Sequence, residues 1–261
     1  MSKVYYKSED DIEQLRKAAT VLSQLLGEIA KEIKPGITTL ALDKLAFDYI
    51  QDHGGRPAFL NYNGFPNSLC ISVNDQVVHG IPSDYVLKDG DIVSVDGGVE
   101  LNGYISDSAY TFAVGEVDEE VTRLLQATLK SLDLGIAQAV SGKRVGDIAY
   151  AVQEHVSQYG YGIVRELVGH GVGFKLHEKP EVPNYGRRGS GPKLETGLVI
   201  CIEPMINLGK AGVKFWDDGW TVSTVDGKVS AHFEHMVAIR KGTPDVLTTF
   251  SYIEEVLGKK N

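Results

Sequence analysis

Residues 90–112, GDIVSVDGGVELNGYISDSAYTF, have the pattern of a β-hairpin. Two β-prone runs flank Asn102-Gly103, a dipeptide typical of a two-residue turn between antiparallel strands. If these two residues form the turn, Leu101 pairs with Tyr104, and the register of the whole ladder follows from that pair.

This register predicts that two acidic side chains share one face of the hairpin. Asp96 pairs with Ala109, and Asp107 has the same parity as Ala109. We therefore expect Asp96 and Asp107 to be diagonal neighbours, roughly 7–8 Å apart in the backbone. Repulsion between the carboxylates would favour protonating one of them unless cations lie between them.

The pattern around the hairpin recurs later in the chain, which indicates an internal duplication. GITTLALDKLAFDYIQDHG begins at Gly36 and GKRVGDIAYAVQEHVSQYG begins at Gly142, an offset of 106. GDIVSVDGG begins at Gly90 and GLVICIEPM begins at Gly197, an offset of 107. Two helix-helix-strand units are predicted, with Asp96 and Glu203 at equivalent strand ends, although many strand ends are polar.

The helices that complete these units are visible in the hydrophobic periodicity. Ser8-Glu9-Asp10-Asp11 fits a capping box at the start of an amphipathic helix that ends before Lys34-Pro35-Gly36. Further helices are expected at 38–53, 118–140 and 145–159. We expect one domain over 1–261, with pseudo-symmetric halves of about 1–115 and 116–261.

A second pair of carboxylates lies in apolar, β-prone segments. Glu203 is in VICIEPM and Glu234 is in SAHFEHMVAI, where an unpaired carboxylate is costly to bury. A buried salt bridge is one explanation, with Lys210 and Arg240 as the nearest basic residues. Four carboxylates with one imidazole would instead suit paired Mn²⁺, Fe²⁺ or Co²⁺ ions, and would neutralise two divalent charges.

Composition restricts the partners of the chain. The net charge is -9 and no block of Lys or Arg occurs, which argues against nucleic-acid and anionic-membrane partners. No run approaches the roughly 18 apolar residues of a membrane span. Two cysteines and the absence of an apolar secretory segment favour a reducing cytoplasm.

Five motifs, in this order and spacing, resemble the type I methionine aminopeptidases. They are NYNGFPNSLCISVNDQVVHGIP, SVDGG...ISDSAYTF, GHGVGFKLHEKP, VICIEPM and FEHMVAI, and the resemblance covers about residues 8 to 250. It implies the α/β pita-bread fold, with pseudo-twofold duplicated units and a central curved antiparallel sheet. With no zinc-finger extension and no type II helical insertion, the chain resembles the compact bacterial form.

The resemblance also implies a site with two divalent metal ions, chosen from Co, Mn, Fe(II), Zn and Ni. Its ligands would be Asp96, Asp107, His170, Glu203 and Glu234, with Asp107 and Glu234 bridging the two ions. His79 and His177 would contact the scissile amide and the tetrahedral intermediate, and Glu203 would carry the proton to the leaving amine. His232 and His235 flank Glu234 on a predicted strand, and one of them is a candidate to support a ligand.

A pocket for the methionine side chain is implied in the same way. Its residues would be Phe59, Tyr62, Phe65, Cys70, His79, Leu176, His177 and Trp220. The aromatic residues could equally be ordinary core, and Cys70 a small buried hydrophobe. Phe59 replaces a small residue, often Cys, and Leu176 replaces an aromatic residue, so the pocket is expected to be reshaped. Ile105-Ser106 replaces a frequent His-Gly.

The implied activity is removal of the initiator methionine from nascent polypeptides with a small second residue. The resemblance further implies a monomer with transient ribosome contact. One rival is another pita-bread hydrolase, such as a prolidase or aminopeptidase P, but these usually have a large additional amino-terminal domain. The other rival is a metal-free binding protein, which should have lost ligands that are all present here.

Overall fold

The computed structural model describes residues 4–258 as helices packed against antiparallel sheets. The first half contains α1 Glu9–Glu32, α2 Thr39–Asp52, β1 Arg56–Pro57, η1 Tyr62–Gly64, β2 Leu69–Val73, β3 Gln76–Val78, β4 Ile92–Leu101 and β5 Tyr104–Ala113. The second half contains α3 Glu119–Ile136, α4 Val145–Val156, η2 Ser157–Tyr159, β6 Gly162–Ile163, β7 Gly169–Gly171, β8 Glu178–Val182, β9 Val199–Ile202, β10 Met205–Asn207, β11 Val213–Phe215, β12 Val222–Thr224, β13 Ser230–His232, β14 His235–Ala238, β15 Asp245–Val246 and α5 Ser251–Leu257.

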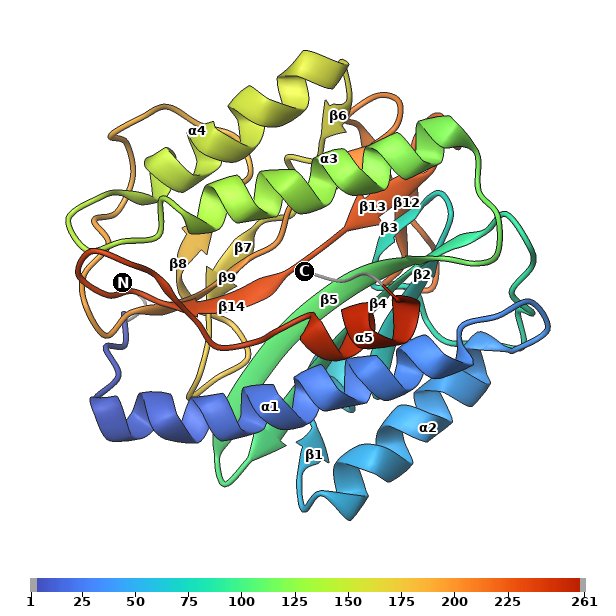
Figure 1. Cartoon of the computed structure of the whole chain (residues 1–261), viewed down its shortest axis with the longest axis horizontal. Coiled ribbons are helices and arrows are strands. Elements are labelled where there is room, and N and C mark those ends of the chain that lie inside the picture. The colour runs from blue at the N-terminus through green and yellow to red at the C-terminus, as the bar shows by residue number, and fades with distance from the viewer. Residues whose placement is uncertain (1–3, 259–261) are drawn as a thin grey trace.

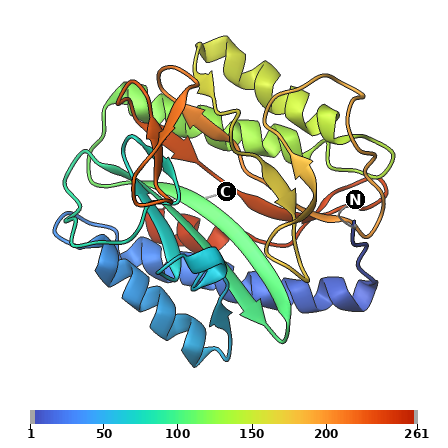
Figure 2. The same cartoon turned by 180° about the vertical axis from the view of Figure 1, so that it is seen from behind.

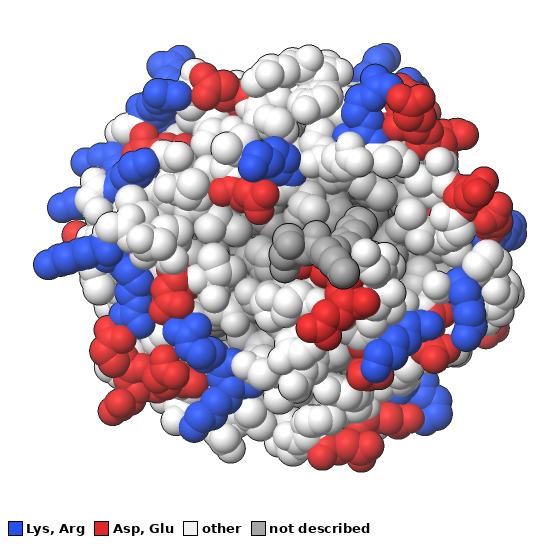
Figure 3. Space-filling model, in the orientation of Figure 1, with Lys and Arg blue, Asp and Glu red and all other residues white. Residues whose placement is uncertain are grey.

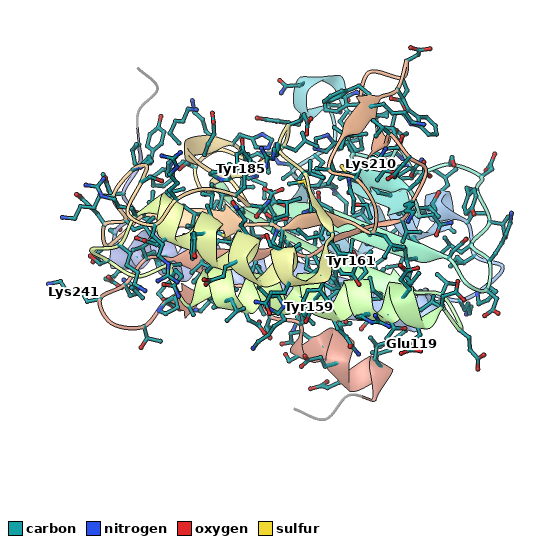
Figure 4. All side chains as sticks on the ribbon, turned by 90° about the horizontal axis from the view of Figure 1, so that it is seen from above. Glu119, Tyr159, Tyr161, Tyr185, Lys210 and Lys241 are labelled. Atoms are coloured by element: carbon teal, nitrogen blue, oxygen red, sulfur yellow. The ribbon has the colours of Figure 1, made fainter. Side chains whose placement is uncertain are left out.

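The predicted helices are present, with small differences at their ends. The capping box is confirmed, because Ser8 Oγ accepts the Asp11 N–H and Asp11 accepts the Ser8 N–H. The helix expected at 118–140 ends at Ile136, because the Gln138 and Ala139 N–H groups turn to Gly135 O and Ile136 O, three residues back, instead of continuing the α-helical ladder. The helix expected at 145–159 ends at Val156 and continues as η2. After it, Tyr159 stacks on Tyr161 with ring centroids 5.5 Å apart (Figure 4).

The pairing of the strands confirms the predicted register of the hairpin. Asn102 and Gly103 both have positive φ, at 53° and 82°, as a type I′ turn requires. Leu101 pairs with Tyr104, and β4 pairs with β5 along its whole length. β2 and β1 also pair with β4, which makes a four-stranded antiparallel sheet.

A five-stranded antiparallel sheet, in the order β15-β14-β9-β7-β8, belongs to the second half. It meets β5 where the Glu234 N–H donates to Ala109 O at 2.9 Å and Ser108 Oγ donates to Glu234 O at 2.8 Å. The central sheet is therefore formed from two separately paired parts, joined along β5. Figures 1 and 2 show α1, α3 and α5 on one face of these strands.

The duplication is confirmed in backbone detail. Gly36 and Gly142 have φ of 98° and 99°, and Gly90 and Gly197 both have φ of 90°. Gly36 N–H donates to Leu87 O at 2.8 Å, as Gly142 N–H donates to Leu194 O at 3.0 Å. The two units therefore share the same turn geometry, which glycine adopts without the steric penalty of a side chain.

One continuous apolar core joins the two halves. It includes Leu26 of α1, Val95 of β4, Ile148 of α4 and Ile200 of β9, all fully buried. α5 closes the core against α1, where a Cβ on Gly27 would lie 2.7 Å from Tyr252 Cβ. In residues 4–258, every helix is too short or too polar to cross a bilayer.

Candidate active site

The first half supplies two carboxylates from β4 and β5. Asp96 pairs with Ala109 and Asp107 pairs with Gly98, so both side chains point to the same face, as the hairpin pattern predicts. Asp107 is only 3% exposed and Asp96 is half-buried. The twist of a long hairpin thus places two acids at the seam between the halves.

The second half supplies three further side chains from separate elements. His170 is the middle residue of β7, and Glu203 directly follows β9. Glu234 was expected within a strand, but the strand is interrupted between β13 and β14. The reason is that Phe233 N–H turns to Pro204 O and Glu234 N–H turns to Ala109 O. This interruption directs Glu234 toward the first half.

The five side chains converge on one cavity. His170 Nε2 lies 3.7 Å from Asp107 Oδ2 and 3.5 Å from Glu203 Oε1, at or beyond the limit of a hydrogen bond. Ligand atoms of Asp107, His170 and Glu234 all lie within 4.8 Å of one another, and Cys201 Sγ is within the same limit. Such spacing leaves room for an ion between the groups.

Each of the four carboxylates has a buried oxygen without a hydrogen-bond partner. These atoms are Asp96 Oδ1, Asp107 Oδ1, Glu203 Oε1 and Glu234 Oε1. Within residues 4–258, no Lys or Arg forms an ion pair with them, and Arg240 instead pairs with Glu9 and Asp245. The salt-bridge explanation is therefore not supported. Carboxylate and imidazole donors with unsatisfied lone pairs fit divalent cations.

Burial changes the protonation of these groups strongly. Desolvation is the main cause that raises the pKa of Asp96 to about 7 and the pKa of Glu203 to about 8. Desolvation, followed by repulsion from neighbouring carboxylates, raises the pKa of Asp107 and of Glu234 well above their ordinary values. Without a cation, the site therefore takes up protons, and a bound cation would reverse this effect.

A cavity of about 190 Å³ opens beside the carboxylates. It is lined by all five predicted ligands and by all eight predicted pocket residues: Asp96, Asp107, His170, Glu203, Glu234, Phe59, Tyr62, Phe65, Cys70, His79, Leu176, His177 and Trp220. Five further lining residues were not singled out from the sequence: Asn63, Val78, Leu167, Val168 and Met205. Most are ordinary apolar residues beside a motif, so their type gives no signal of a pocket.

The apolar end of the cavity is a small aromatic cluster. Phe59, Phe65, Cys70 and Leu176 are all buried and pack together, with Trp220 partly buried beside them. The rings of Phe65 and Trp220 meet edge to face, with centroids 5.1 Å apart. The core explanation and the pocket explanation therefore describe the same residues, because these side chains pack together and also line the cavity.

Two neutral histidines lie between the carboxylates and the cluster. His177 Nδ1 lies 2.8 Å from Tyr62 Oη, and its ring meets the His170 ring with centroids 4.3 Å apart. Burial lowers the pKa of His79 to about 4 and also lowers the pKa of His177. Neutral imidazoles at these positions can each offer one hydrogen-bond donor and one acceptor.

His232 and His235 have different surroundings from each other. His232 Nε2 lies 3.6 Å from Glu203 Oε2, so it stands beside Glu203 and not beside its sequence neighbour. His235 Nδ1 lies 2.7 Å from Thr248 Oγ1, and its ring stacks on Phe250. Of the two candidates, only His232 reaches a predicted ligand in the described chain. Cys201, missed from the sequence, shares the strand face of Glu203 two residues away.

Comparison with known proteins identifies the chain as a metallopeptidase, the class of protein that its fold and site indicate. The sequence pattern of metallopeptidase family M24 matches residues 13–241, so the chain belongs to this family, whose members bind divalent metal. A methionine aminopeptidase of Clostridium perfringens is 51% identical over 245 residues, which cover 94% of this chain and 98% of that protein.

Solved structures narrow the assignment within the family. The methionine aminopeptidase of Thermotoga maritima matches with a TM-score of 0.93 at 40% identity, covering 95% of this chain and 100% of that one. A prolidase of Pyrococcus furiosus matches with a TM-score of 0.77 at 25% identity, and only 65% of that chain is covered. The chain thus belongs among the methionine aminopeptidases, which remove the N-terminal methionine.

Proposed function

We propose that the chain removes N-terminal methionine with a dinuclear metal site. Asp96, Asp107, His170, Glu203 and Glu234 would hold the two ions, with Asp107 and Glu234 shared between them. The observation that carries this proposal is the convergence of four buried, unpartnered carboxylate oxygens beside an apolar cavity. Four carboxylates neutralise two divalent cations, which would remove the cost of burying them.

The metal identity is limited by the donor set. Oxygen and imidazole donors favour Mn, Fe(II) and Co, and Zn and Ni also remain candidates. When bound, two such cations would polarise the scissile carbonyl and lower the pKa of a water molecule toward neutrality. The chain's own residues then have to orient the substrate and move the protons.

Glu203 is the proton carrier in this proposal. The position of Glu203 beside His232 suits a carboxylate that exchanges a proton during the reaction, and its pKa is about 8 when no cation is bound. It receives the proton from the attacking water and passes it to the leaving amine. Bound cations would lower the pKa of Glu203. Its uptake and release of the proton would therefore depend on how charge is redistributed within the site during the reaction.

His79 and His177 stabilise the reacting amide. Both line the cavity between the carboxylates and the aromatic cluster, and both are neutral at pH 7. The contact between His177 Nδ1 and Tyr62 Oη leaves Nε2 as the second ring nitrogen for the substrate. A donor placed in this way contributes roughly 10²- to 10³-fold to turnover.

The aromatic cluster receives the methionine side chain. Phe59, Phe65, Cys70 and Leu176 offer an apolar lining that suits a flexible thioether, and Trp220 closes one side. The rest of the substrate is a nascent polypeptide with a small second residue. Prolyl substrates are the runner-up, favoured only by the weaker prolidase match.

Monomeric state, transient ribosome contact and a single domain over 1–261 are parts of the same proposal. The shared core of the two halves supports the single domain. In Figure 3, Lys and Arg are interspersed with Asp and Glu around the rim of one face, without a broad basic surface there. The cytoplasmic location and the lack of nucleic-acid specificity stay predictions from the sequence.

The proposal is tested with Asp107→Asn, metal analysis and two substrate classes. The native protein should contain divalent metal and cleave Met-Ala-Ser in preference to Xaa-Pro peptides. Asp107→Asn should lose metal and turnover together while its fold survives, because Asn keeps the shape and relieves repulsion with Asp96. If Asp107 were structural, the variant would instead be destabilised by about 3–5 kcal/mol with activity per folded molecule nearly normal.

Asp91→Asn is the matched control for that variant. Asp91 is also buried, but it accepts hydrogen bonds from Asn74, Tyr85 and the Lys88 N–H. The Asp91→Asn variant should lose about 1–3 kcal/mol of its free energy of unfolding and retain its metal. Full metal occupancy with near-normal turnover in Asp107→Asn would exclude the dinuclear mechanism.

A further inference from the structure

Lys7 and Glu178 form an ion pair in which neither side chain is exposed to solvent. No other Lys or Arg ion pair in residues 4–258 is buried on both sides. Lys7 precedes α1, and its N–H donates to Gly197 O at 2.7 Å. The segment continues back to Val4, which bridges Lys179, so the start of the described chain runs beside β8 (Figure 2).

Glu178 directly follows His177 and organises the turn in front of it. One carboxylate oxygen of Glu178 accepts the ammonium of Lys7. The other accepts the backbone N–H groups of Phe174 and Lys175 at 2.8 and 3.0 Å. The carboxylate therefore bonds both to Lys7, in the segment before α1, and to the turn at 173–177.

The opposite end of this turn is held by β5 and by the lysine stem. Gly173 O accepts the Ile105 N–H at 2.8 Å. Lys7 crosses over Gly173 so closely that a Cβ there would lie 2.7 Å from Lys7 Cε, and the ammonium lies 5.4 Å from the centre of the Phe174 ring. The turn is thus enclosed on both sides, and it presents Leu176 and His177 to the cavity.

A pair of this kind is a poor way to gain stability. Removing two charges from water costs several kcal/mol for each ion, and well-packed apolar side chains at such positions are often as stable or more stable. An apolar pair, however, could not accept the two turn N–H groups. The arrangement of donors and acceptors therefore points to placement of the turn as the role of these residues.

We propose that Lys7 and Glu178 are positioning residues that fix turn 173–177, and so hold His177 against the reacting amide and Leu176 in the pocket. This inference rests on the role of His177 in the proposed function. Neither Lys7 nor Glu178 lines the cavity. They act on turnover through the turn, and metal binding does not depend on them.

The test separates positioning from stability with two double variants. Lys7→Met/Glu178→Met makes the pair apolar and removes the acceptor of the turn N–H groups. Lys7→Met/Glu178→Gln also removes both charges but retains an acceptor oxygen. We expect both to melt near the native temperature and to retain metal. Turnover of Met-Ala-Ser should fall roughly 10- to 100-fold in the first, the range for a displaced catalytic group, and stay near native in the second.

The exposed pair Lys179–Glu181, which begins at the next residue after Glu178, is the matched control. Lys179→Met/Glu181→Met should leave kcat, KM and metal content unchanged. Native turnover in a well-folded Lys7→Met/Glu178→Met variant would overturn the proposal, because a merely structural pair predicts that result. An equal loss of turnover in the Gln variant would also overturn it, since the acceptor would then be irrelevant.

Amide exchange provides a readout that does not require activity. The Phe174 and Lys175 N–H groups should exchange faster in Lys7→Met, with no change in metal content. If the apolar double variant does not fold, Lys7→Met decides the question, with Asp91→Asn as a variant destabilised elsewhere. Unchanged exchange and unchanged kcat in Lys7→Met would refute the inference. Failure of the proposed function would be seen separately, as a native protein without metal or methionyl cleavage.

Discussion

Phe59 is the residue whose identity most directly shapes the methionine pocket. It is 7% exposed, and its ring packs over Gly98, where a Cβ would lie only 3.0 Å from Phe59 Cε1. The bulk of the ring is therefore accommodated by the absence of a side chain across the ladder. This pairing explains how the chain holds a ring as large as that of phenylalanine at position 59.

Truncating Phe59 to Ala or Cys should widen the acceptance of larger N-terminal side chains. One methylene group more or less in such a pocket is worth only about 1–3 kcal/mol, so we expect a shift in preference and no new specificity. The ratios of kcat/KM for Met, norleucine, Leu and Phe substrates measure the effect. Unchanged ratios across the four would show that Phe59 does not limit the pocket.

For single residues, the sequence predicts the position of a side chain well where that residue belongs to a regular secondary-structure pattern. Parity along the hairpin correctly placed Asp96 and Asp107 on one face, because strand side chains alternate. The proximity of Cys201 to the site and of His232 to Glu203 depends on how separate strands cross at the seam. No local pattern contains that information.

The tip of the β11–β12 hairpin is the element that carries Trp220 to the cavity. Asp218 holds the turn, since its carboxylate accepts the N–H groups of Trp220 and Thr221 at 2.8 and 2.9 Å and the Thr221 hydroxyl at 2.6 Å. Gly219 has φ of 81°, which a turn this tight requires. Together these contacts direct Trp220 toward Phe65.

Asp218→Ala should loosen this turn and weaken methionine binding. Loss of hydrogen bonds worth about 1 kcal/mol each should raise KM for methionyl substrates roughly five- to tenfold, with metal content unchanged. Asp217→Ala, at the exposed neighbouring position, is the control and should leave KM alone. A normal KM in Asp218→Ala would mean that packing against Phe65 alone positions Trp220.

Element types were predictable from the sequence, whereas some boundaries were not. The helices have a strong apolar period, and the Asn-Gly turn fixes the register of β4 and β5. The break before β14 is set by Ala109, a partner far along the chain, whereas α3 ends in local turns at Gln138 and Ala139 that its apolar period does not reveal. A tertiary hydrogen bond therefore overrides the local continuation of the strand before β14.

For the whole molecule, metal removal and pH should be coupled. Carboxyl groups with a raised pKa bind more protons in the folded than in the unfolded chain, so they lower stability as pH rises between the two pKa values. The pKa of Asp96 is about 7 and the pKa of Glu203 is about 8. These two groups therefore lower stability as pH rises above their ordinary pKa values of 3.8 and 4.5. His79 and His170 have lowered pKa values of about 4 and 3, so they lower stability only below their ordinary value of 6.5.

Among these groups, only the carboxylates change stability between pH 6.5 and 8. They therefore determine how the stability of the chelated protein depends on pH in this window. The chelated protein should melt at progressively lower temperature as pH rises through this window, and the metal-loaded protein should change little because cations replace the protons. Thermal melts with and without chelator measure this difference. Glu203→Gln should flatten the chelated curve. A chelated melting temperature that stays constant or rises would contradict the pKa assignments.

The duplicated architecture was predictable because both copies retain the glycines at their turns. The way in which the two copies meet was not, because the contact of Glu234 with Ala109 joins segments more than a hundred residues apart. The motifs therefore predict the ligand set by resemblance, and the seam between the sheets explains why these residues come together.

The position of the site at that seam also determines when, during synthesis of the chain, the site can form. Asp96 and Asp107 are made early, in a hairpin that can fold locally, but their partners Glu203 and Glu234 are made much later. A chain still emerging from the ribosome can therefore carry two of the five proposed metal ligands before the other three have been made. In the proposed arrangement the site is complete only after Glu234 has been synthesised and has docked against β5, so we expect partial translation products to lack activity.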